Sequence, residues 1–77
     1  MKVYRYILEL GPNNEIEGLS RIVETNTAMW GEYYDGKGIW KKADYVIASY
    51  IREPGHDEFF YDEERANEIM AYIDANL

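Results

Sequence analysis

The residues best suited to chemistry are acidic side chains near the C-terminal end of the chain. Five of them, which could offer hard oxygen ligands to Ca²⁺ or Mg²⁺, are Asp57, Glu58, Asp62, Glu63 and Glu64. Their spacing lacks the ordered ligands and the central glycine of an EF-hand loop. We therefore expect a solvated loop and helix start here, with no metal site.

Histidine as a residue type changes charge close to neutrality, so His56, the single histidine, could act beside Asp57 as a proton shuttle or a pH switch. Catalysis requires positioned partners, and no serine or threonine is adjacent to it in the sequence. The absence of cysteine excludes disulfides, thiolate metal ligands and a cysteine nucleophile. We expect a noncatalytic protein that uses no cofactor.

Gly36, Lys37 and Gly38 form a short segment that could be mistaken for part of a phosphate-binding loop. A P-loop needs a longer glycine spacing and a serine or threonine directly after its lysine. Since neither is present, the segment that begins at Asp35 is more typical of a tight hairpin turn.

Four aromatic residues lie around this turn, namely Trp30, Tyr33, Tyr34 and Trp40. Amphipathic rings of this kind could form a platform for a peptide, a sugar ring or an unpaired base. A domain this small must also bury aromatic side chains simply to fold. If the rings are exposed, they predict a protein that binds small ligands or peptides. If they are needed for folding, they belong to the hydrophobic core.

The net charge of -7 arises entirely from residues 53–77, where eight acidic residues accompany one arginine. Residues 1–52 are balanced, with seven acidic and seven basic residues. Such asymmetry bears on association and solubility. It opposes direct binding to DNA or RNA, which depends largely on neutralising phosphates.

The charge distribution predicts a noncatalytic protein-interaction module that presents its acidic C-terminal third to a basic protein partner. The predicted partner-binding residues are Glu58, Asp62, Glu63, Glu64, Glu68, Tyr61 and Trp40. A sharper version is an inhibitor that imitates nucleic acid, with carboxylates in place of phosphates. The competing interpretation is an acidic surface that only keeps the protein soluble.

The elements that must position these residues follow from hydrophobic spacing. Residues 2–10 alternate as a half-buried strand does, with Tyr4, Tyr6 and Leu8 on one side and Arg5 and Ile7 on the other. Further strands are expected at residues 18–24, where a short helix is the alternative, at 28–34, from 39 onward and, as a short edge, at 59–61.

Two amphipathic helices are expected. The first has its apolar stripe at Ala43, Val46, Ile47, Tyr50 and Ile51 and should end at Pro54-Gly55. The second should be capped by Asp62, with an apolar stripe at Ala66, Ile69, Met70, Ile73 and Leu77.

Together these elements predict one domain over residues 1–77, an α+β fold with an antiparallel sheet of three to four strands and two helices packed on one face. No stretch approaches the roughly 20 apolar residues of a membrane span, so we expect a cytoplasmic protein without membrane contact. Homodimerisation is compatible with this fold, because a small sheet leaves strand edges available.

The chain resembles small uncharacterised bacterial and phage-borne proteins in which a Leu-x-Arg-Ile/Val strand leads to a tryptophan-and-glycine hairpin, a helix and an acidic Glu-Glu-x-Ala helix. The matching residues are Leu19-Ser20-Arg21-Ile22-Val23, Tyr34-Asp35-Gly36-Lys37-Gly38-Ile39-Trp40 and Asp62-Glu63-Glu64-Arg65-Ala66. Tyr34 stands where a tryptophan often precedes the Asp-Gly turn. The resemblance implies a fold pattern and no activity.

Overall fold

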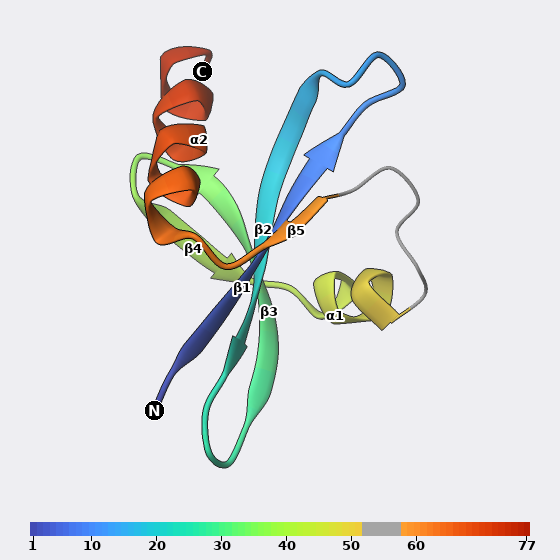
Figure 1. Ribbon diagram of the computed structural model, residues 1–77, viewed down its shortest axis with the longest axis vertical. Helices are drawn as coiled ribbons and strands as arrows, with labels where there is room; N and C mark the ends of the chain where they lie inside the picture. The colour runs from blue at the N-terminus through green and yellow to red at the C-terminus, as the bar shows by residue number, and fades with distance from the viewer. Residues whose placement is uncertain (52–57) are drawn as a thin grey trace.

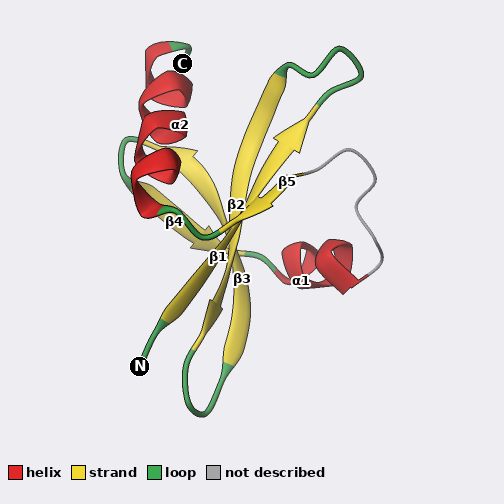
Figure 2. Ribbon diagram, viewed as in Figure 1, coloured by secondary structure: helices red, strands yellow, loops and turns green. Residues whose placement is uncertain are grey.

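The computed structural model describes residues 1–51 and 58–77 and contains one five-stranded antiparallel sheet with two helices (Figures 1 and 2). The strands follow the order β4-β3-β2-β1-β5 across the sheet. The elements are β1 (Val3–Leu10), β2 (Ile16–Glu24), β3 (Met29–Gly36), β4 (Ile39–Lys42), α1 (Asp44–Ile51), β5 (Glu58–Phe60) and α2 (Glu63–Ala75). The predicted α+β class is confirmed.

The sheet is wider than the three to four strands predicted, because both short segments pair with their neighbours. β4 pairs with β3, with Trp40 opposite Tyr34, and β5 pairs with β1, with Phe60 opposite Tyr6. The turn between β3 and β4 holds Gly36, Lys37 and Gly38 at positive φ values of 99°, 55° and 78°. This conformation favours glycine and confirms the predicted hairpin turn.

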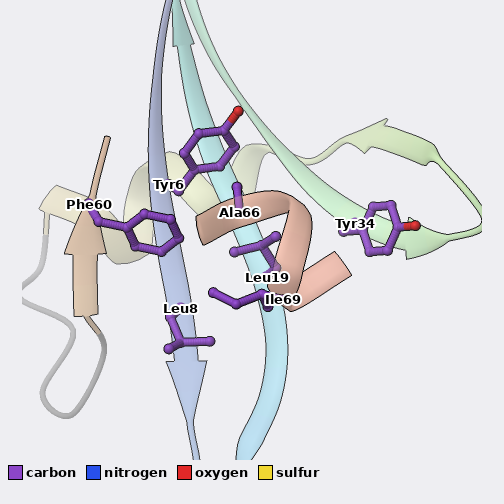
Figure 3. Close-up of a cluster of buried hydrophobic side chains, with 7 residues drawn as sticks. All are labelled: Tyr6, Leu8, Leu19, Tyr34, Phe60, Ala66 and Ile69. Carbon is purple, nitrogen blue, oxygen red and sulfur yellow. The ribbon is translucent and has the colours of Figure 1, made fainter. Parts of the chain in front are cut away.

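One face of the sheet packs against α2. Its buried cluster, which Figure 3 shows between the strands and the helix, comprises Tyr6, Leu8, Leu19, Tyr34, Phe60, Ala66 and Ile69. Tyr6 and Leu8 are the positions that the alternation along β1 assigns to one side. The Asp62 side chain accepts a hydrogen bond from the Glu64 backbone N–H at 3.0 Å, which confirms the predicted helix cap.

The opposite face packs against α1. Its buried cluster consists of Ile7, Ile22 and Val46. The sequence placed both helices on one face, whereas these contacts place them on opposite faces, as the ribbon also shows (Figure 1). Gly31 makes this arrangement possible, because a Cβ atom there would lie 2.6 Å from the Cβ of Val46.

The C-terminal end of α2 differs from the sequence expectation. α2 ends at Ala75, and Leu77, expected in its apolar stripe, is 72% exposed. The Pro54-Gly55 segment, predicted to end the first helix, lies outside the described residues. Within the two described stretches, neither helix is long and apolar enough to cross a membrane.

Candidate interaction surface

The predicted acidic residues extend from β5 to the middle of α2, and their contacts differ. Glu58 forms an ion pair with Arg65, and Asp62 caps the helix. Glu63, Glu64 and Glu68 are exposed, and none of them forms an ion pair with another described residue. Their side chains lie in solvent in the described part of the chain.

Helical spacing arranges two of these carboxylates in a row on the outer side of α2. Glu64, Glu68 and Tyr72 are four residues apart, so they lie on one side of the helix, and all three are exposed. The other side of the helix buries Ala66 and Ile69 against the sheet. The packing of α2 thus fixes which carboxylates face solvent.

Tyr61 lies directly before α2 and is 60% exposed. Its hydroxyl accepts a hydrogen bond from Nε of Arg5 at 2.8 Å, and the Arg5 guanidinium lies 5.5 Å from the centre of its ring. These contacts hold the ring beside β1 while much of its area stays in solvent. We refer to Tyr61, Glu63, Glu64, Glu68 and Tyr72 as the acidic surface.

A groove of about 280 Å³ adjoins the acidic surface where the start of β1 approaches α2. Its lining residues are Lys2, Val3, Tyr4, Tyr6, Tyr61 and Glu63. We call it the N-terminal groove. Tyr61 and Glu63 are predicted site residues, whereas Lys2, Val3 and Tyr4 join them only because β5 pairs with β1. Nothing in their local sequence indicates this meeting.

Trp40, the remaining predicted site residue, is not on the acidic surface. The guanidinium of Arg21 lies between two rings, 4.0 Å from the centre of the Trp40 ring and 4.4 Å from that of Tyr4. Trp40 also packs against Tyr34, with ring centroids 5.2 Å apart. Its contacts are those of a packed cluster inside the molecule.

Glu32 completes this cluster. It accepts hydrogen bonds from Nε of Arg21 at 2.7 Å and from Nε1 of Trp30 at 2.8 Å. Burial by itself would raise the pKa of the Glu32 carboxyl, but the hydrogen bonds from Trp30 and Arg21 and the charge of Arg21 together lower it. Glu32 is therefore held in its charged form by its neighbours.

The four aromatic residues expected to form one platform are divided between the two faces of the sheet. Tyr33 packs beside the α1 cluster, with its ring centroid 6.2 Å from that of Tyr45. Tyr34 belongs to the opposite cluster and is only 7% exposed. A single ligand could not lie across both, so the geometry does not favour the aromatic platform.

The residues considered for metal binding and catalysis do not form a site in the part of the chain that the structure describes. No group of three His, Cys, Asp or Glu side chains in residues 1–51 and 58–77 is arranged to hold a metal ion. His56 and Asp57 lie outside these residues. The buried hydroxyl of Ser20 donates a hydrogen bond to Glu9, which explains how this polar group is accommodated in the sheet.

Comparisons of the chain with protein-family models, with curated proteins and with solved structures found no match. The resemblance drawn from the short motifs stays a prediction. Function must be inferred from the surface itself.

Proposed function

We propose that this protein is a noncatalytic interaction module that binds a basic surface of another protein through its acidic surface. The observation that carries this proposal is the set of exposed carboxylates, Glu63, Glu64 and Glu68, that have no ion-pair partner among the described residues. They lie on a helix that the core holds in place, so a partner would meet a preorganised row of charge.

Exposed aromatic rings support the same proposal. Tyr61 and Tyr72 flank the carboxylates and are 60% and 50% exposed. Tyrosine supplies a large contact area at low entropic cost and is enriched where proteins bind each other. A charged row with aromatic side chains at its ends suits a partner that carries lysine or arginine around an apolar patch.

A narrower form of the proposal is an inhibitor whose carboxylates occupy a cationic channel that normally accepts nucleic acid. The net charge of -7, concentrated in residues 53–77, supports it. In this form the partner would be released by competing nucleic acid, whereas a partner bound elsewhere on its own surface would be retained.

The test is affinity capture from a nuclease-treated lysate of the native host, comparing wild type with a Glu63→Lys, Glu64→Lys variant. A Glu17→Lys, Glu24→Lys variant serves as the control, because it makes the same charge change at exposed positions of β2. Circular dichroism must show that both variants fold. A protein retained by wild type and by the control, but lost by the α2 variant, supports the proposal.

Two outcomes would contradict the proposal. Equal capture by all three proteins would mean that binding does not use the acidic surface. Equal loss in both variants would mean that only the total charge matters, as expected for an acidic surface that merely keeps the protein soluble.

A further inference from the structure

The first residues of β1 extend past the end of β5. β5 pairs with β1 only through Tyr6, Ile7 and Leu8, whereas β2 pairs with β1 from Val3 onward. The ribbon shows the start of β1 projecting beyond β5 (Figure 1). At Val3 and Tyr4 the sheet therefore has an open edge on its β5 side, where no described strand pairs with the backbone N–H and C=O groups.

The N-terminal groove beside this open edge carries charges of both signs. Lys2 and Glu63 both line it, and both side chains are exposed. Neither forms an ion pair with any residue in 1–51 or 58–77. A groove with one unpaired cation and one unpaired anion is not complementary to a segment of a single charge. It is complementary to a surface that carries the same two charges in the reverse order.

Apolar side chains also lie exposed at this end of β1. Met1 is 87% exposed and Val3 is 37% exposed. An exposed strand edge with apolar side chains tends to pair with another chain, unless charged residues, proline or a bulge block it. Lys2 is the single charged residue before Arg5, and the irregularity in the pairing of β1 lies at its other end, between Glu9 and Leu10. The open edge is therefore able to pair.

We propose that this open edge pairs with the same edge of a second copy of the chain. The two β1 strands would run antiparallel about a two-fold axis and join the two sheets in a homodimer. In such an interface each contact occurs twice, so the surface must be complementary to itself. This inference goes beyond the proposed function and does not depend on it.

A pairing centred on Val3 meets this requirement. It places the two Val3 side chains opposite each other on one face of the joined sheet. On the other face, Lys2 lies opposite Tyr4 of the second copy. Because Tyr4 and Glu63 line the same groove, Lys2 of each copy meets Glu63 of the other. The pairing thus covers the exposed apolar residue and forms two symmetry-related ion pairs.

Charge reversal with mixing tests this contact between copies. Sedimentation velocity of the full chain over a range of concentrations should show a dimer for wild type. Lys2→Glu and Glu63→Lys should each raise the dimer dissociation constant by about tenfold or more, because attraction becomes repulsion at two symmetry-related contacts. A mixture of the two variants should dimerise again, because each chain then carries the charge that the other requires.

The controls make the same charge changes away from the groove. Lys37→Glu and Glu17→Lys alter exposed positions that do not line it. Each should dimerise as wild type does. Both groove variants keep a negative net charge, so general attraction between oppositely charged proteins cannot account for dimers in their mixture. Circular dichroism must show that all four variants fold.

Amide hydrogen exchange measured by NMR tests the backbone contact separately. Successive N–H groups of a strand point alternately to its two neighbours, so one of the amides of Val3 and Tyr4 points outward. Its exchange should slow by about tenfold or more between protein concentrations at which wild type is a monomer and those at which it is a dimer. Lys2→Glu alone should show no such slowing.

Three results would overturn the inference. If wild type stays monomeric up to the concentrations used for NMR, the edge does not pair with itself. If it dimerises but the groove variants behave as the controls do, or their mixture stays monomeric, another surface makes the dimer. If mixing restores the dimer without slowing exchange at Val3 or Tyr4, the side chains meet but the strands do not pair. Lysate capture judges the proposed function independently of all three.

Discussion

The carboxylate of Asp74, near the end of α2, accepts hydrogen bonds from the hydroxyl of Tyr34 at 2.8 and 3.0 Å across 40 residues of sequence. The same carboxylate accepts the backbone N–H of Lys37 at 2.9 Å, and the Tyr34 hydroxyl accepts that of Gly38 at 2.8 Å. One acidic residue thus joins the last helix to the β3–β4 turn. It is a negative charge used for structure rather than for binding.

Replacing Asp74 with alanine should therefore destabilise the protein by about 1–3 kcal/mol, because the buried Tyr34 hydroxyl and the Lys37 N–H lose their acceptor. Urea denaturation followed by circular dichroism measures this change. Asp74→Asn keeps one acceptor oxygen and should cost less. Equal losses in both variants would show that the carboxylate's geometry matters less than its charge.

Gly31→Ala should destabilise the protein by about 1–3 kcal/mol, since the added methyl group would meet Val46 at 2.6 Å and the backbone oxygen of Ala43 at 3.0 Å. The matched control is Gly18→Ala, whose methyl group would meet only the flexible end of Glu9. Thermal unfolding compares the two. A variant at Gly31 as stable as the control would show that α1 shifts at little cost.

Glu32→Gln should lower the free energy of unfolding near pH 7 by about 1 kcal/mol, because Arg21 loses a charged partner. The pKa of Glu32 is lowered from 4.5 in the folded protein, so its contribution is present above 4.5 and is lost as pH falls through the folded pKa. The difference between variant and wild type should therefore shrink in urea titrations near pH 3. If the difference in free energy of unfolding between variant and wild type does not change with pH, it arises from packing and not from the charge of Glu32.

Alkaline conditions should weaken the fold. Burial is the main cause that raises the pKa values of Tyr6 and Tyr34 above 10.0 in the folded protein, so the unfolded chain loses these protons first. Their stabilisation is complete below about pH 10 and is lost as pH rises through the folded values. Urea unfolding across this pH range measures the loss of stability, and tyrosinate absorbance measures the ionisation of the tyrosines. Unchanged stability above pH 10 would contradict the expectation.

Much of the fold could be predicted from the sequence, because these features depend on interactions between residues close together in the chain. The alternation of Tyr4, Tyr6 and Leu8 predicted β1 because strand periodicity depends on neighbouring residues alone. The glycines at 36 and 38 predicted the hairpin turn, and Asp62 predicted the helix start, for the same reason. Of the candidate site, the exposure of Glu63, Glu64 and Glu68 agrees with helical spacing.

Only the tertiary structure decided which distant residues meet. Both sides of β1 carry apolar residues, so the pattern could not say which helix covers Ile7 and which covers Tyr6. The close approach of α1 to Gly31 places α1 on the face of the sheet that carries Ile7. Likewise, the register of β5 on β1 brings Tyr61 and Glu63 to the groove that Lys2, Val3 and Tyr4 also line. Contacts of this kind depend on packing between segments far apart in the chain, which no local pattern encodes.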